Sequence, residues 1–197
     1  MAQAHPISRL GGWEGYEVGG HWTERRDGRS WCVIRLEPLR GRPRCCSRCG
    51  QFTAAIHDLE ERRIRDLPLF EHWVELRILR VRVECPTCGP KLERLAWLPA
   101  YARVTQRLAE SAAHLCKVMT LRHVARYFGL DWKTVKAIDR ACLERELGPV
   151  DLEGLEVIGL DEFALHKGHR YATVIVEARP RRGREIFWGV KTARPGR

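Results

Sequence analysis

Two short cysteine motifs are the residues of this sequence whose types and spacing most directly indicate chemistry. The pattern C-x-x-C-G occurs at residues 46–50, CSRCG, and again at 85–89, CPTCG. Two intervening residues let both thiolates of a pair reach one tetrahedral zinc ion, and the glycine that follows permits a tight turn with positive φ. Two such pairs complete a four-sulfur site, which is typical of a structural zinc. The predicted ligands are Cys46, Cys49, Cys85 and Cys88.

Other uses of cysteine fit the spacing less well. The chain has eight cysteines, and in a reducing compartment we do not expect them to form disulfides. Four ordinary buried or free thiols are one alternative, and a redox C-x-x-C pair is another, although a redox pair would not need a second copy. Cys45 is an alternative ligand that breaks the two-residue spacing. The remaining cysteines stand alone and are expected in the core: Cys32, Cys116 and Cys142.

A second feature with chemical potential is a pair of acids at the end of an apolar strand. The stretch VIGLDEFALHKG, residues 157–168, has strand-forming residues followed at once by Asp161 and Glu162. Two carboxylates at the end of an apolar strand are costly unless a positive group meets them, and that group is often a metal ion. The sequence therefore raises the question of which cation this strand would hold.

Strands are needed to bring the two cysteine motifs together. Between them, RRIRDLPLF leads into HWVELRILRVRVEC, where apolar residues recur at 74, 76 and 78 and then at 79, 81 and 83. The phase slips once, between Ile78 and Leu79, as a β-bulge would cause, and the strand would deliver Cys85 to the metal. Ahead of the first motif, SWCVIRLEPL is predicted to form another strand, with which GYEV would pair.

A helical segment follows, with the features of a helix-turn-helix. Thr105 can cap a first helix, and Thr120 can cap a short helix over residues 121–128. Gly129 supplies a turn, and Asp131 can cap the next helix. Apolar residues at helical spacing would face inward on each helix. We therefore predict a helix-turn-helix whose second helix begins just after Asp131.

The outer face of that second helix is predicted to contact DNA. Lys133, Lys136 and Arg140 suit phosphates, and these residues together with Thr134 can reach base edges in the major groove. The net charge of +10 also favours an anionic partner. Two plainer explanations stay open, because helices of bundles have basic outer faces too, and 29 Arg against 6 Lys could reflect a GC-rich genome.

The composition excludes some classes of protein. An apolar content of 44% is that of an ordinary folded protein. No apolar run approaches the roughly 20 residues of a membrane-spanning helix. The N-terminus, MAQAHPISRLGGWEG, lacks the apolar core of a signal peptide. We expect a cytoplasmic protein without a membrane partner.

The last part of the sequence is predicted to hold three successive antiparallel strands. They are EVIGLDEFAL, YATVIVEA and EIFWGV, separated by the turns KGHR and RPRRGR. A meander whose first strand carries an acid matches the opening of a ribonuclease H-like fold.

The order of these modules resembles bacterial insertion-sequence transposases with an N-terminal zinc-binding region and a DDE catalytic domain. The resemblance runs from about Glu37 to Val190, and LDEFALHKGHRYATVI is its most specific part. We therefore expect an α+β, multi-module fold. Its parts are a zinc-ribbon-like β module at 1–99, a helix-turn-helix DNA-binding module at 100–148 and the first three strands of a ribonuclease H-like domain at 149–197.

The resemblance also implies a function. In that family the zinc module and the helix-turn-helix recognise terminal inverted repeats in double-stranded DNA, and three acids hold two divalent ions, magnesium or manganese, for strand cleavage and transfer. Asp161 matches the first acid, and Glu162 is a neighbour, since adjacent strand residues point to opposite faces. The second Asp and the Glu find no match. We thus expect a C-terminally truncated transposase that binds element ends without cutting them alone, with dimerisation of the chain left open.

Two other functions are kept beside this one. The chain could act as a DNA-binding regulator or transposition inhibitor derived from a transposase. It could also be a zinc-ribbon module whose contacts are mainly with protein. Footprinting on inverted-repeat DNA separates the third possibility from the first two.

Overall fold

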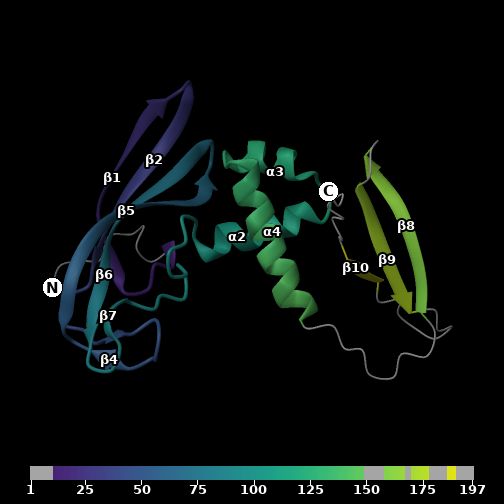
Figure 1. Ribbon diagram of the computed structural model, residues 1–197. Coiled ribbons are helices and arrows are strands. Elements are labelled where there is room, and N and C mark those ends of the chain that lie inside the picture. The colour runs from purple at the N-terminus through teal and green to yellow at the C-terminus, as the bar shows by residue number, and fades with distance from the viewer. Residues whose placement is uncertain (1–10, 149–157, 167–169, 178–185, 190–197) are drawn as a thin grey trace, which may run out of the picture. The chain divides into compact units, whose positions relative to one another are not determined.

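The computed structural model describes residues 11–148, 158–166, 170–177 and 186–189 (Figure 1). The chain divides into two compact units, Met1–Leu143 and Glu144–Arg197, which are described separately. Strands and helices are both present, so the fold is α+β as expected. Among the described residues, no helix is long and apolar enough to cross a membrane.

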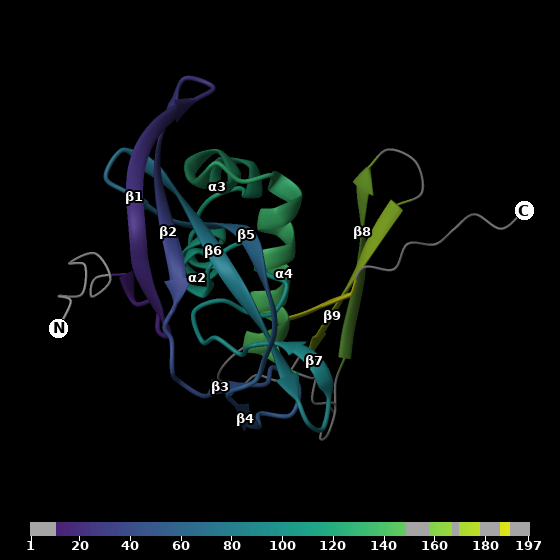
Figure 2. The ribbon, with the colours of Figure 1, turned by 90° about the vertical axis from the view of Figure 1, so that its left-hand side faces the viewer.

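A twisted sheet forms the body of the first unit. Its strand order is β1-β2-β6-β5, with β7 added to β6 (Figure 2). The β2 and β6 strands are parallel, and the other pairs are antiparallel. A separate two-stranded ribbon pairs β3 with β4. The strands are β1 Tyr16–Arg26, β2 Arg29–Pro38, β3 Arg44–Cys45, β4 Phe52–Thr53, β5 Ile56–Leu69, β6 His72–Cys85 and β7 Gly89–Leu92.

The β6 strand is buried on opposite faces in its two halves. Val74, Leu76 and Ile78 pack into one core, whereas Val81 and Val83 pack into another with Cys46 and Cys85. Pairing with β5 runs without a register shift from Arg82 back to Val74. The predicted bulge between residues 78 and 79 is therefore wrong. The apolar phase changes because different segments cover the two faces, not because the backbone inserts a residue.

Three helices follow the sheet, with the predicted caps. They are α2 Gln106–Cys116, α3 Leu121–Phe128 and α4 Trp132–Leu147. The Thr105 and Thr120 side chains accept from backbone N–H groups of the first turns of α2 and α3. Gly129 ends α3 in the left-handed conformation with φ 61°. The core of the helix-turn-helix is small, and its buried members include Leu108, Ala112, Val124, Ala125, Phe128 and Val135.

The second unit contains the predicted meander. It comprises β8 Ile158–His166, β9 Arg170–Glu177 and β10 Ile186–Gly189 in the order β10-β9-β8, with both pairs antiparallel. The predicted three-stranded sheet is thus confirmed. Residues 149–157, 167–169 and 178–185 lie outside the described residues, and they include most of the predicted turn KGHR and all of the predicted turn RPRRGR. The relation of this sheet to a ribonuclease H-like fold stays a prediction.

Candidate zinc centre and DNA-binding surface

The four predicted zinc ligands lie together at one end of the sheet. The metal-ligating sulfur atoms of Cys46, Cys49, Cys85 and Cys88 all fall within 4.8 Å of one another. One motif follows β3, and the other begins at the last residue of β6. Gly50 and Gly89 have φ of 80° and 66°, as the tight turns require. Among the described residues, these cysteines are the one cluster of this kind.

The electrostatics of the cluster favour a bound cation. Backbone N–H groups, first that of Cys49, lower the pKa of the Cys46 thiol to about 7. Burial and the neighbouring thiols of Cys49 and Cys85 raise the pKa of Cys88 to about 12. Thiolates packed this closely repel one another, and a divalent ion removes the repulsion by binding all of them. The donor set and its geometry therefore fit a structural zinc.

Cys45 lies beside the cluster but outside it. Its Sγ is 3.4 Å from the Gly50 carbonyl oxygen, to which the thiol donates. Its own carbonyl accepts from the backbone N–H of Arg94 at 2.7 Å. In the structure Cys45 therefore packs against the first turn, and it is not among the four clustered cysteines.

A buried acid, Glu93, lies next to the first cysteine motif and supports it. Glu93 forms a β-bridge with Cys46, and its side chain contacts the guanidinium groups of Arg42 and Arg44. The carbonyl of Glu93 accepts from Arg80 at 2.6 Å. Burial raises the pKa of Glu93 although these arginines lie beside it. The loop that carries the cysteines is therefore held by charged as well as apolar contacts.

The basic face of α4 is exposed. Lys133, Lys136 and Arg140 are exposed, Thr134 is half-buried, and Val135 is fully buried on the opposite face. Asp131 caps the helix, because its Oδ1 accepts from the backbone N–H of Lys133 at 2.8 Å. The predicted inward and outward faces of α4 are confirmed. Whether these side chains touch DNA stays a prediction.

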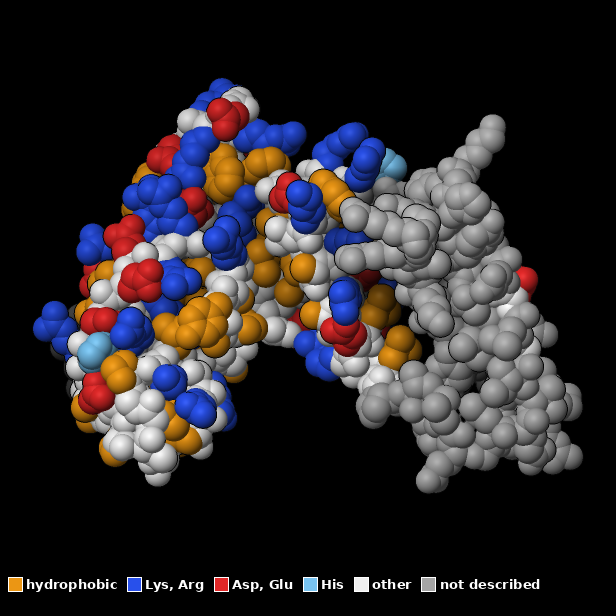
Figure 3. All heavy atoms as spheres, viewed as in Figure 1, with side chains coloured by type: hydrophobic (Ala, Val, Ile, Leu, Met, Phe, Trp, Pro, Cys, Tyr) orange, Lys and Arg blue, Asp and Glu red, His pale blue; other side chains and the backbone are white. Residues whose placement is uncertain are grey.

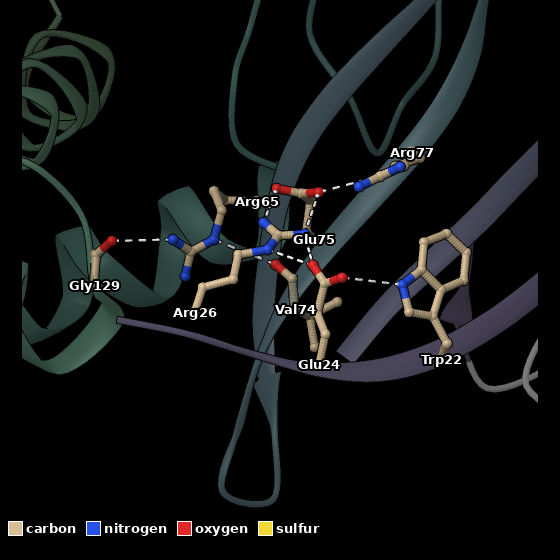
Figure 4. A network of polar contacts seen from close by, with 8 residues as sticks. All are labelled: Trp22, Glu24, Arg26, Arg65, Val74, Glu75, Arg77 and Gly129. Atoms are coloured by element: carbon tan, nitrogen blue, oxygen red, sulfur yellow. Dashed lines mark hydrogen bonds and ion pairs between the residues drawn. The ribbon is translucent and has the colours of Figure 1, made fainter. Parts of the chain in front are cut away.

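Arg65 joins the sheet to the turn of the helix-turn-helix. Its guanidinium donates to the carbonyls of Gly129 at 3.0 Å and Val74 at 3.3 Å (Figure 4). It also donates to the carbonyl of Phe128 at 3.0 Å and stacks on the rings of Trp31 and Trp73. Burial lowers the pKa of Arg65. A helix C-terminus attracts cations, so the charge is placed where the α3 dipole favours it. Sequence reasoning missed this residue.

Glu75 organises a second set of charges on the same face. Both its oxygens accept from Arg26, at 2.8 and 3.1 Å, and one accepts from Arg77 at 3.4 Å (Figure 4). Burial alone would raise the pKa of Glu75, but the bonds from Arg26 and Arg77 lower it. Glu24 also accepts from Arg26 and from the Trp22 indole (Figure 4). This network ties the end of β1 to the first part of β6.

Asp66 does the same on the opposite face. It is buried and accepts from the Trp13 indole at 3.0 Å, from the Thr105 hydroxyl at 2.7 Å and from Arg107 at 2.7 Å. The N-terminal segment, β5 and the start of α2 therefore meet on one carboxylate. The available signal was the charged pair within RRIRDLPLF, since charges inside an apolar strand need partners.

Asp161 lies within β8 of the second unit. It is exposed and pairs with Val174 of β9. The strand continues past it to His166, so the acid is inside the strand and not at its end. Its assignment as the first catalytic acid stays a prediction.

Comparisons with known proteins match both parts of the first unit. The family model for the zinc-finger of transposase IS204/IS1001/IS1096/IS1165 matches residues 42–88. The family model for the helix-turn-helix domain of transposase family ISL3 matches residues 93–142. The first match includes all four clustered cysteines, and the second includes α2, α3 and most of α4.

Transposases of insertion sequences are similar to the chain over most of its length. The IS1001 transposase of Bordetella parapertussis is 44% identical over 184 residues, which cover 92% of this chain and 44% of the relative. The IS1557 transposase of Mycobacterium tuberculosis, in two strains, is 30% identical over 74% of this chain and 33% of the relative. The chain therefore spans less than half the length of these relatives. No solved structure matches it. With the zinc-finger and the helix-turn-helix domains of the family both present, the chain belongs to the ISL3 family of insertion-sequence transposases.

Proposed function

We propose that this chain is the DNA-recognition part of an insertion-sequence transposase and that it binds the terminal inverted repeats of its element. The observation that carries the proposal is the exposed basic face of α4 in a capped helix-turn-helix. The relatives named as transposases support it. The substrate is double-stranded DNA, which in a bacterium lies in the cytoplasm.

In this proposal α4 enters the major groove. Lys133 and Lys136 lie in its first two turns, where a recognition helix approaches the duplex, and Arg140 follows one turn later. The cations bind phosphates and fix the register, while Thr134 and the neighbouring side chains read base edges. Val135 of α4 packs in the core with Phe128 of α3. This packing keeps the opposite, basic face of α4 directed outward.

Zinc has a structural role in the proposal. Cys46, Cys49, Cys85 and Cys88 form a closed four-sulfur shell, which leaves no position for a substrate. The metal would fasten the loop after β3 to the end of β6. The three-part division at 1–99, 100–148 and 149–197 belongs to the same proposal, as does a possible homodimer.

Asp161 is proposed as the first of the three family acids that hold magnesium or manganese. Two-metal catalysis requires cations about 3.5–4 Å apart, each with several oxygen ligands. Asp161 is the one acid of this sequence that the family pattern matches. We propose that the polypeptide 1–197 alone binds DNA ends without cutting them.

Binding to the ends of the element tests the proposal. Fluorescence anisotropy should show tighter binding to a duplex carrying the inverted repeat than to a scrambled duplex. The triple variant Lys133→Gln/Lys136→Gln/Arg140→Gln should bind more weakly, and its plot of log Kd against log salt should flatten by roughly one unit for each phosphate that is no longer bound. A matched control removes three exposed charges elsewhere, at Arg40, Arg48 and Arg103.

The outcomes separate the candidate functions. If the triple variant binds as the unmodified protein does, α4 is not the recognition helix. If neither duplex is bound, a protein-interaction module replaces the DNA-binding proposal. Sedimentation of the protein with and without DNA reports whether it dimerises.

A further inference from the structure

The tip of the β1–β2 hairpin carries arginines that the proposed function does not use. The tip, residues 24–30, turns at Asp27 and Gly28, whose φ values are 50° and 74°. Pairing of β2 with β6 begins only at Trp31, so the tip extends past the neighbouring strand. Arg25 and Arg29 are exposed there.

The arginines of the tip differ in how they are neutralised. Arg26 contacts two acids, Glu24 and Glu75. Within the part of the chain that the structure describes, Arg25 and Arg29 form no ion pair; the Arg29 guanidinium instead stacks 4.5 Å above the Trp73 ring. Two positive charges are thus presented to solvent at the tip of the hairpin. They are suited to an anionic partner outside the protein.

The tip is fixed next to the turn of the helix-turn-helix. Trp73, on which Arg29 stacks, contacts Gly129 so closely that a Cβ there would lie 2.5 Å from the ring. Arg65 stacks on the same ring and donates to Gly129. Asp131, which caps α4, is two residues further on. One indole ring therefore separates the cation of Arg29 from the loop that leads into the basic helix.

Cations from segments far apart in the sequence are thus placed along one side of the first unit. Figure 3 shows Lys and Arg side chains over the hairpin tip and over α3. Arg122 and Arg126 of α3 are exposed as well. Counting both strands, a duplex carries one phosphate per about 1.7 Å of its axis, and phosphates line both sides of each groove. A protein that inserts a helix into the major groove therefore meets further phosphates beside that helix.

We propose that the β1–β2 tip is a second DNA-contact element, a wing that binds the phosphate backbone beside the groove entered by α4. Arg25 and Arg29 make the contacts, and Arg26 with Glu75 and Trp31 holds the hairpin in position. The wing does not contribute to sequence specificity, because contacts between guanidinium groups and phosphates do not depend on the base sequence. The inference rests on the proposed binding of α4 to DNA, and it extends the bound site beyond the base pairs that a single helix covers.

Two duplexes that share one recognition site but differ in flank length test the wing. On the long duplex, Arg25→Gln/Arg29→Gln should flatten the salt dependence by about two units of slope, one for each phosphate bound by the wing. When the salt concentration rises fourfold, from 50 to 200 mM, the variant should therefore lose about 16-fold less affinity than the unmodified protein, because a slope difference of two units corresponds to the square of the salt ratio. On a duplex trimmed to the α4 site, the variant and the unmodified protein should bind alike.

Matched variants keep the test decisive. Arg40→Gln/Arg48→Gln removes the same charge from the opposite end of the sheet and should leave hydroxyl-radical protection beside the α4 site intact. Arg25→Gln alone breaks no interaction within the described part of the protein, so its effect cannot come from misfolding. Equal footprints for the unmodified protein and Arg25→Gln/Arg29→Gln would overturn the wing while leaving α4 binding in place. The wing would also be overturned if the α4 triple variant were the only variant that binds DNA more weakly than the unmodified protein.

Discussion

Arg65 of β5 and Gly129 after α3 are joined by a 3.0 Å hydrogen bond from the guanidinium to the backbone carbonyl. Arg65→Ala should lower the free energy of unfolding by about 2–4 kcal/mol, because the carbonyls of Val74, Phe128 and Gly129 lose a charged donor and two indoles lose a stacked cation. Arg65→Lys should recover only part, since an ammonium lacks the planar fork. Urea unfolding measures this. Arg63→Ala, at an exposed neighbour on β5, should stay within about 0.5 kcal/mol of the unmodified protein.

Gly129 should resist substitution for two reasons that can be separated. Its φ of 61° costs an alanine about 1–2 kcal/mol, and the added Cβ would overlap the Trp73 ring. Gly28 has φ 74° with no heavy atom near its missing Cβ, so Gly28→Ala isolates the first cost. We expect Gly129→Ala to destabilise by at least about 1 kcal/mol more. Equal thermal midpoints for the two variants would show that the turn does not pack on Trp73 as described.

The zinc site predicts opposite results for adjacent cysteines. Elemental analysis should find about one zinc per chain in the unmodified protein and in Cys45→Ser, whereas Cys46→Ser should lose the metal. Chelation should lower the thermal midpoint of the unmodified protein, because zinc binding contributes directly to folding. Metal-free protein of unchanged stability would exclude a structural zinc.

Stability should fall in acid partly through Glu75. Its pKa is lowered in the folded protein by Arg26 and Arg77, so its contribution is complete above the unfolded value of about 4.3 and is lost as the pH falls through the folded value. Glu75→Gln should therefore be less stable than the unmodified protein at pH 7. The gap should narrow as the pH is lowered below about 4. Urea midpoints across this range measure the gap, and acid loss of zinc cancels in the comparison. A constant gap would mean that Glu75 titrates no differently in the two states.

Strand cleavage by the polypeptide 1–197 is not expected. Incubated with inverted-repeat DNA and manganese, it should leave the duplex intact, with or without Asp161→Ala, while the IS1001 transposase provides the comparison. Cleavage that disappears in Asp161→Ala would show that other acids complete the site. The gel assay separates this result from a failure to bind DNA.

The parts of the fold that follow from local sequence were predictable. Thr120, Gly129 and Asp131 set the ends of α3 and α4 through their own side chains or backbone preferences, so these boundaries matched. The cysteine spacing predicted the cluster because each motif forms its own turn. The parallel pairing of β2 with β6 carries no local signal, and neither does the meeting of Asp66 with Trp13 and Arg107. The phase of β6 was misread because burial on alternate faces looks like a bulge when the neighbours are unknown.

The parallel β2–β6 pair has a consequence for the rate at which the protein folds. Parallel strands need a long connection. Closing that loop costs conformational entropy before the contacts between the strands can stabilise the chain. The first cysteine motif lies near the start of this connection, and the second lies at the far end of β6, so a metal bound to both would bridge most of the connection. Zinc bound by the unfolded chain would close most of this loop in advance. The entropy that β2 and β6 lose when they pair would then be smaller. The metal would then speed refolding as well as slow unfolding, and a newly made chain would acquire its sheet faster where zinc is available.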